Sequence, residues 1–150
     1  MTRFYEVIVE PDTAPDGSMN WLVTAPAFPE VTTFGKTQAS ACQNGLGAIA
    51  EAMAARMIDG EDIPNPITGT HGQGRFVPIP GLTYLKITLY KLCRHQRVSR
   101  AELGRRLTWH REQVDRLFRL DHKSHLDQIE AAYMAIGVPL SFAIDVPETT

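Results

Sequence analysis

The sequence predicts an α+β fold, in which a small antiparallel sheet covered by one long helix precedes an all-α part of short helices. Apolar residues alternate along short segments of the first half and recur every three to four residues afterwards. Charge divides in the same way. Residues 1–80 hold four basic and nine acidic residues, a net charge of −5, whereas residues 81–150 hold eleven basic and eight acidic residues, a net charge of +3. We therefore expect two domains, of which the first suits a basic protein and the second suits nucleic acid.

Length and composition exclude several classes of protein. The chain has 150 residues and 43% hydrophobic residues, which is enough for a packed core and argues against wholesale disorder. No apolar run approaches the roughly 18 residues of a membrane-spanning helix. Residues 1–10 lack the pattern of a secretory signal, and the two cysteines, Cys42 and Cys93, are too few for a disulfide framework. We expect a cytoplasmic protein.

The first half contains three strand patterns. Tyr5, Val7 and Val9 alternate with other residues and should share one face of the first strand. Residues 12–20 are rich in Pro, Asp and Gly and are typical of a hairpin loop. The strands are expected at Phe4–Glu10, Trp21–Ala25 and Val31–Phe34.

One amphipathic helix follows the strands. Apolar residues from Ala39 to Met57 recur at spacings of three and four, which predicts a helix of about five turns with Thr37 as its N-cap. Gly45 and Gly47 lower its intrinsic stability but permit close packing on the sheet. Residues 59–75 are rich in Pro and Gly and are predicted to be linker-like.

The second half is predicted to consist of short helices. Residues 82–92 form a helical apolar stripe, and residues 99–102 and 124–127 match the S-x-x-E and S-x-x-D patterns of a helix start. Gly137 suits the position after a helix C-terminus. These helices follow a further edge strand, expected at Phe76–Pro80, and we place the domain boundary near Pro80–Gly81.

The chain closes with an alternating segment, Leu140–Val146, which predicts a strand without a partner in its own domain. We expect this strand to pair with its symmetry mate in a homodimer or higher homo-oligomer.

Residues 98–118 have the spacing of a helix-turn-helix motif. They lie in residues 86–123, where eleven basic and four acidic residues give a net charge of +7. Trp109 is expected to be buried between the helices, and the outward side chains of the second helix suit base edges. The competing interpretation is a helical hairpin with a solvated basic face. The expected DNA-binding residues are Ser99, Arg100, His110, Arg111, Glu112, Gln113, Arg116 and Lys123.

No pattern predicts catalysis, a metal or a cofactor. His122 and His125 lack a third metal ligand, and the Gly-rich run at 69–75 lacks the Lys and Ser or Thr of a phosphate-binding loop. Ser and Cys residues lack a nucleophile signature. The acids of the first strand and loop, Glu6, Glu10 and Asp12, have no second acidic cluster to complete a nuclease site.

The chain resembles the HicB family, the antitoxins of HicA–HicB toxin–antitoxin systems. In the first half the resemblance rests on FYEVIVE, WLVTAPAFPEVTTFGKTQASA and IPNP, and in the second on SRAELGRRL and VDRLFRLDHKSHLDQIEAAYMAIGVPLSFAI. It covers nearly the whole chain, although Thr108 stands in the turn where Gly is frequent.

The resemblance implies a degenerate, non-catalytic RNase-H-like first domain that binds a HicA-type mRNA-cleaving toxin. It also implies a helix-turn-helix domain that represses the operon as a dimer through a pseudo-palindromic operator. Tyr5, Trp21, Phe28 and Glu30 are candidates for the toxin contact, and the three aromatic residues suit core or turn packing equally well.

Two other functions stay open at the level of the sequence. The chain could be a stand-alone transcriptional regulator of phage or prophage type, with a sensor first domain and no toxin partner. It could also be a ribonuclease-like enzyme, against which the missing acidic constellation argues.

Overall fold

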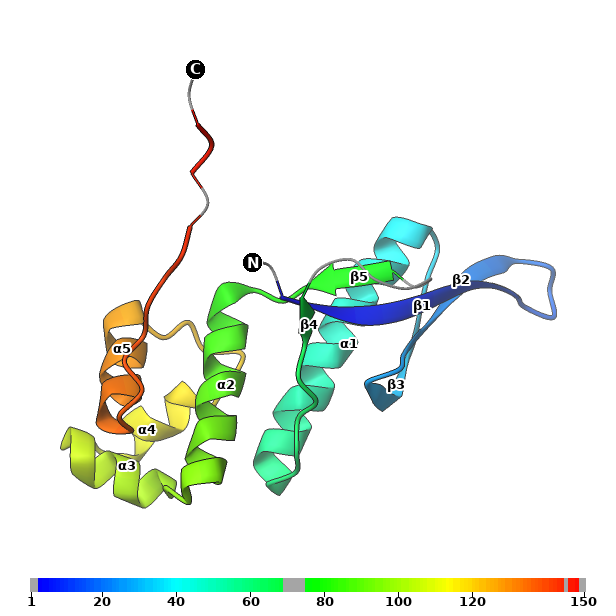
Figure 1. Ribbon diagram of the computed structural model, residues 1–150. Helices are drawn as coiled ribbons and strands as arrows, with labels where there is room; N and C mark the ends of the chain where they lie inside the picture. Colours follow the sequence, from blue (N-terminus) through cyan, green and yellow to red (C-terminus); the bar gives the residue numbers. More distant parts are fainter. Residues whose placement is uncertain (1–2, 69–74, 145, 149–150) are drawn as a thin grey trace.

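The computed structural model describes residues 3–68, 75–144 and 146–148. These residues form an α+β fold, as the sequence predicts, with the strands and the longest helix in the first half (Figure 1). No helix among them is long and apolar enough to cross a membrane. The elements are β1 (Arg3–Thr13), β2 (Met19–Ala25), β3 (Phe28–Gly35), α1 (Gln38–Asp59), β4 (Ile67–Thr68), β5 (Arg75–Pro78), α2 (Gly81–Gln96), α3 (Arg100–Leu107), α4 (Arg111–Leu117) and α5 (Leu126–Ala135).

Strand β1 is a central strand of the antiparallel sheet and pairs with β2, β4 and β5. Its second half pairs with β2, with Val9 opposite Val23, and its first half pairs with β5, with Tyr5 opposite Val77. The short strand β4 also pairs with β1, and β3 forms an edge beside β2. The third strand is longer than predicted because it includes Pro29, whose missing N–H is tolerated on an edge strand.

Helix α1 is capped at both ends. The Ser40 N–H donates to the Thr37 hydroxyl oxygen at 3.0 Å, and the Thr37 N–H donates to the Ser40 hydroxyl oxygen at 3.1 Å. This confirms the N-cap predicted at Thr37. The helix ends at Gly60, whose φ of 71° is left-handed and favours glycine.

The two central glycines of α1 have opposite surroundings. A Cβ atom at Gly45 would lie 2.9 Å from Val23 Cγ1 and 3.5 Å from Val7 Cγ1, so this glycine sets the distance between α1 and the sheet. A Cβ atom at Gly47 would meet no heavy atom within 4 Å.

We expect Gly47→Ala to raise the free energy of unfolding by about 0.5–1 kcal/mol, because alanine stabilises an exposed helix position. Gly45→Ala should lower it by about 1–3 kcal/mol, because the added methyl group overpacks the helix–sheet interface. Urea unfolding of both variants beside the unmodified protein measures the difference. Equal effects of the two substitutions would contradict this account of the packing.

The segment after α1 is packed rather than linker-like. Ile63 is fully buried. The Tyr5 hydroxyl donates to the Pro64 carbonyl at 2.6 Å, and the Tyr90 hydroxyl donates to the Glu61 carbonyl at 2.7 Å. Residues 60–66 are therefore tied to β1 and to α2. Most of the Gly-rich run, residues 69–74, lies outside the described residues.

Of the three helix ends predicted for the second half, the structure confirms two. Ser99 accepts the Glu102 N–H at 3.0 Å, and Gly137 has a left-handed φ of 76° after α5, as predicted. The start predicted at Ser124 is wrong. His125 is the N-cap of α5, and the Ser124 hydroxyl instead donates to the Arg116 carbonyl at 3.4 Å.

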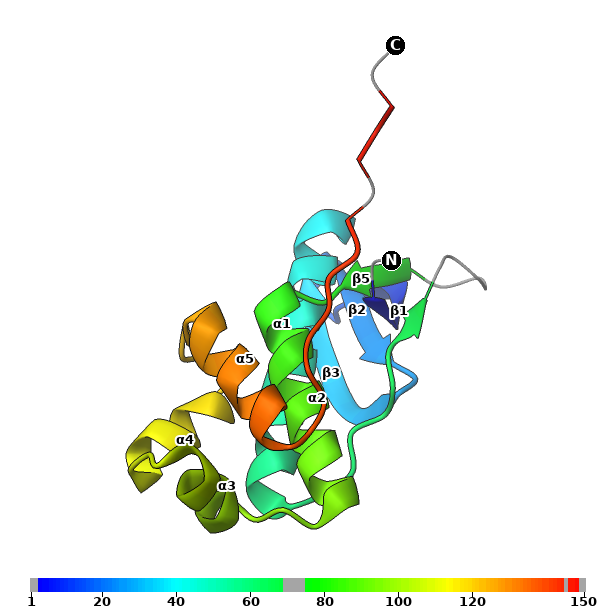
Figure 2. The same cartoon turned by 60° about the vertical axis from the view of Figure 1, so that its left-hand side comes forward.

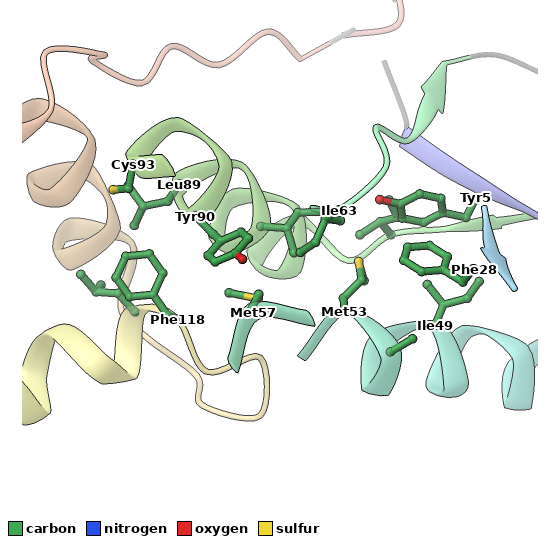
Figure 3. Packing of buried hydrophobic residues seen from close by; sticks show 14 of the residues in the cluster. Tyr5, Phe28, Ile49, Met53, Met57, Ile63, Leu89, Tyr90, Cys93 and Phe118 are labelled. Carbon is green, nitrogen blue, oxygen red and sulfur yellow. The ribbon is translucent and has the colours of Figure 1, made fainter. Parts of the chain in front are cut away.

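Helix α2 lies between α1 and the group formed by α3, α4 and α5 (Figures 1 and 2). Tyr133 of α5 donates its hydroxyl proton to the Leu85 carbonyl at 2.5 Å, and the Gln96 side-chain amide donates to the Ile136 carbonyl at 3.0 Å. Buried side chains continue from the sheet past α2 to α4. Figure 3 shows this core, which includes Tyr5, Phe28, Ile49, Met53, Met57, Ile63, Leu89, Tyr90, Cys93 and Phe118.

The strand predicted at Leu140–Val146 does not form among the described residues of that segment. In the single chain no neighbouring strand hydrogen-bonds to it, and one strand alone is not stable. Leu140 is half-buried against the core, but three other apolar side chains are exposed: Phe142 by 58%, Ile144 by 82% and Val146 by 80%. Residues 140–143 border a pocket that Tyr84 and Leu85 of α2 also line, and the described residues beyond 143 leave the body of the protein as an extended arm (Figure 1).

Candidate functional site

A tight turn joins α3 to α4. Helix α3 ends at Thr108, whose φ of 58° is left-handed and unusual for a β-branched residue. The Trp109 N–H donates to the Gly104 carbonyl at 3.0 Å. A Cβ atom at Gly104 would lie 3.3 Å from the Trp109 carbonyl oxygen. Glycine at this position therefore lets the turn fold back closely onto α3.

Apolar side chains fill the inner side of this helix pair. Leu103, Val114 and Leu117 are at most 1% exposed. Trp109 is half-buried and packs against the core, so the burial expected from the sequence is only partial. The opposite side of α4 consequently faces solvent.

Every residue proposed from the sequence to contact DNA is exposed. Four of them lie on α4, two at the start of α3, one at the N-cap of α4 and one in the loop before α5. They are Arg111, Glu112, Gln113 and Arg116, then Ser99 and Arg100, then His110, and finally Lys123.

Three of these side chains already have close partners within the fold, and one of them is Ser99, which accepts the Glu102 N–H at 3.0 Å. Arg100 lies 3.1 Å from the Asp115 carboxylate, and its guanidinium lies 4.9 Å from the centre of the Phe118 ring. The Gln113 side-chain oxygen accepts the His110 N–H at 2.9 Å. The Arg100–Asp115 pair thus helps to fix α4 relative to α3, whereas the Gln113 contact closes the N-terminal cap of α4.

Two arginines on α4 are less constrained. The Arg111 side chain is 90% exposed, and its closest carboxylate is that of Asp115 at 3.8 Å. Arg116 has no ion-pair partner among the described residues. Such side chains can reach a nucleic acid without breaking a strong contact.

A cluster around Glu102 was not predicted as functional. Arg105 lies 2.7 Å and Arg106 3.2 Å from its carboxylate, and these two guanidiniums, with Arg105 first, lower the pKa of Glu102. Arg106 also donates to the Ala135 carbonyl at 3.2 Å, which ties α3 to α5. The spacings of three and four residues are the sequence signal for these pairs.

The most unusual group of the second half is Lys86 of α2, which is fully buried. Its ammonium donates to three backbone carbonyls, those of Arg116 at 2.9 Å, Arg119 at 2.6 Å and His122 at 2.6 Å. These carbonyls belong to the end of α4 and the loop that follows it. Burial lowers the pKa of Lys86 to about 8, so the group remains charged at neutral pH. Lys86 is among the eleven basic residues of 86–123, but its side chain is buried and holds the loop after α4 instead of facing solvent.

The structure corrects two residues proposed from the sequence for the toxin contact. Tyr5 is 2% exposed and Phe28 is fully buried. Their rings meet edge to face with centroids 5.0 Å apart, and burial raises the pKa of Tyr5. Side chains enclosed in this way cannot touch a partner protein.

The other two proposed contacts have structural neighbours. Glu30 forms a two-pronged ion pair with Arg56 at 2.8 and 2.9 Å, which lowers the pKa of the Glu30 carboxyl. The Arg56 guanidinium also lies 5.0 Å from the centre of the Phe28 ring. Trp21 is half-buried against the core.

Among the described residues, no three His, Cys, Asp or Glu side chains are placed to hold a metal ion. Cys42 is half-buried, whereas Cys93 is buried, and burial raises the pKa of its thiol to about 11.

Comparison with known proteins adds independent information. No protein-family model matches the chain. It is 30% identical to Antitoxin HicB of Pseudomonas fluorescens strain Pf0-1, over 83% of this chain and 85% of that protein. It is 29% identical to Antitoxin HicB of Escherichia coli strain K12, over 93% of this chain and 98% of that protein. It is 32% identical to Antitoxin HicB 2 of Photorhabdus laumondii, over 78% of this chain and 82% of that protein.

Proposed function

Because the chain belongs to the HicB family of antitoxins, we propose that it binds and inhibits a HicA-type mRNA-cleaving toxin and represses its own operon by binding the operator. In this proposal it acts by binding, without catalysis of its own. The proposal implies a cytoplasmic protein, because mRNA and operator DNA are both in that compartment. We propose residues 1–80 as the toxin-binding module, with an RNase-H-like fold, and residues 81–150 as the DNA-binding and dimerisation module.

The proposal of operator binding rests on helix α4, which has a buried apolar side and an exposed basic side. Val114 and Leu117 are buried on its inner side, while Arg111 and Arg116 extend from its outer side. We propose that α3, the turn and α4 act as a helix-turn-helix in which α4 enters the major groove. Arginine can donate two hydrogen bonds to a guanine edge, and the loop residue Lys123 suits a backbone phosphate.

The proposal includes a homodimer or higher homo-oligomer. Its support is the C-terminal segment with its extended arm, in which Phe142, Ile144 and Val146 expose apolar side chains that suit a partner surface. Two such arms paired as antiparallel strands would satisfy each other's backbone groups and bury these side chains. A two-fold dimer presents two copies of α4, which suits a pseudo-palindromic operator.

Growth rescue tests the antitoxin half of the proposal. The small reading frame beside this gene is expressed alone and together with this protein. We expect growth arrest in the first case and recovery in the second. Arrest without recovery would contradict the proposed toxin partner and leave a DNA-binding regulator as the surviving part of the proposal.

Substitution of the α4 arginines tests the operator half. Arg111→Ala or Arg116→Ala should weaken binding to operator DNA by about 1–3 kcal/mol if the side chain contacts a base. Lys36→Ala removes the same charge from an exposed residue of the first half and serves as the control. Band-shift titration at fixed salt measures the three affinities. Growth rescue should be unchanged in all of them, and an arginine variant that binds DNA normally but fails to rescue would refute the division into modules.

A further inference from the structure

The sheet has one face turned away from α1. The close approach of Gly45 to Val7 and Val23 places these two valines on the face that α1 covers. Since successive side chains of a strand point to opposite faces, Ile8 and Leu22 point away from the helix. Ile8 is 38% exposed and Phe34, at the edge of the same face, is 47% exposed.

The strand register brings these residues together. Leu22 lies opposite Glu10 on one side and opposite Phe34 on the other, which makes one row across three strands. The next row runs from Ile8 through Thr24 to Thr32. We call this surface the open face and define it by six residues: Ile8, Glu10, Leu22, Thr24, Thr32 and Phe34.

The open face combines an apolar centre with an acidic border. On β1 the same alternation that places Glu10 on this face also places Glu6 and Asp12 there. The residues of β2 and β3 in the two rows include no Lys or Arg. They are Leu22, Thr24, Thr32 and Phe34. Isolated exposed apolar residues are common. Here the exposed Ile8 and Phe34 flank the half-buried Leu22 and have carboxylates beside them, which is typical of a protein-binding surface.

Charge selects among the possible occupants. Nucleic acid would meet only negative charge on this face. A second copy of this chain, placed face to face, would bring its own carboxylates against Glu6, Glu10 and Asp12, and like charges disfavour that pairing. A protein with an apolar patch surrounded by Lys and Arg complements both the centre and the border.

We propose that the open face is the surface on which this antitoxin holds its toxin, and that the toxin presents an apolar patch bordered by basic residues. This inference rests on the proposed function, because it assumes a toxin partner. It replaces the buried Tyr5 and Phe28 with residues of the opposite strand face, which a partner can reach.

Phe34→Glu tests the inference by placing a charge in the apolar centre. Its control is Ile58→Glu, the same kind of change at an α1 residue that is 83% exposed. The probe is the purified product of the small neighbouring reading frame, and the readouts are its binding by calorimetry and growth rescue. We expect Phe34→Glu to weaken binding at least 100-fold and to abolish rescue, while Ile58→Glu matches the unmodified protein. Thermal unfolding and operator binding should stay the same in both variants.

Glu10→Lys provides a second test that does not depend on how the fold tolerates Phe34→Glu. Glu10 is exposed, so the reversed charge leaves the core untouched. It should weaken toxin binding at least tenfold at low salt and less at high salt. A folded Phe34→Glu or Glu10→Lys protein that binds the toxin normally would refute the choice of face. Failure of the unmodified protein to bind the toxin would instead refute the proposed function and this inference together.

Discussion

Replacing Lys86 by methionine lowers the free energy of unfolding by about 2–4 kcal/mol and weakens operator binding. Methionine fills the same space but donates no hydrogen bond, so the carbonyls of Arg116, Arg119 and His122 lose the ammonium that now binds them. Each carbonyl keeps one backbone N–H donor, so the loss is that of hydrogen bonds to a charged group, which contribute about 1.5–3 kcal/mol each. The loop that these carbonyls fix carries Lys123, so the DNA contact that we propose for Lys123 should weaken as well.

Urea unfolding and band-shift titration check this result, the latter at a temperature where both proteins are folded. Lys36→Met makes the same substitution at an exposed residue and should change neither quantity. If Lys86→Met were as stable as the unmodified protein, the ammonium would not be anchoring the end of α4.

The pH dependence of the same pair of proteins gives a further check. Burial lowers the pKa of Lys86 in the folded state to about 8, below its ordinary value of 10.5. Between these two pH values the unfolded chain binds more protons than the folded protein, so the contribution of this group to stability rises with pH. The stability difference between the unmodified protein and Lys86→Met should therefore grow as the pH increases from 8 to 10.5. A difference that shrinks over this range would contradict the assignment.

Phe28→Ala has the other large expected effect, a loss of about 3–5 kcal/mol of unfolding free energy. The ring is fully buried, with Tyr5 at its edge and the Arg56 guanidinium 5.0 Å from its centre. Removal leaves a cavity in the core and also removes the surface on which Arg56 rests.

Phe34→Ala is the matched control, since Phe34 is 47% exposed and its loss should change stability by less than about 1 kcal/mol. Chemical denaturation of the two variants gives the comparison. Normal stability of Phe28→Ala together with lost toxin binding would restore Phe28 as a contact residue.

These phenylalanines illustrate what the sequence could predict in the first half. Alternation correctly grouped Tyr5, Val7 and Val9 on one side of β1, and spacing correctly located α1. Alternation alone does not say which side the helix covers, since that depends on where α1 returns to the sheet. Tyr5 and Phe28 were therefore equally acceptable as contact or core residues until the fold was known.

In the second half, sequence patterns predicted the helix ends correctly where the capping interaction involves only neighbouring residues. Ser99 caps α3 and Gly137 ends α5 as predicted, because both depend on a few neighbouring residues. The helix start predicted at Ser124 was wrong. The Ser124 hydroxyl donates to the Arg116 carbonyl instead, a contact that exists only in the packed fold. Lys86 had a detectable signal, since it occupies the apolar stripe with Leu82 and Leu89, but its carbonyl partners lie on another helix and loop.

The pairing of β1 with β5 has a consequence for how the chain is made. During synthesis β1 leaves the ribosome well before β5. One edge of the first half of β1 therefore stays unpaired until its partner residues, such as Val77, have been synthesised. We expect the local contacts of β1 with β2 and of β2 with β3 to form first, and pairing with β5 to follow at the entropic cost of a long loop. An unpaired strand edge attracts other chains. A product terminated before Arg75 should therefore aggregate, and the sheet of the first half is complete only after translation has passed Pro78.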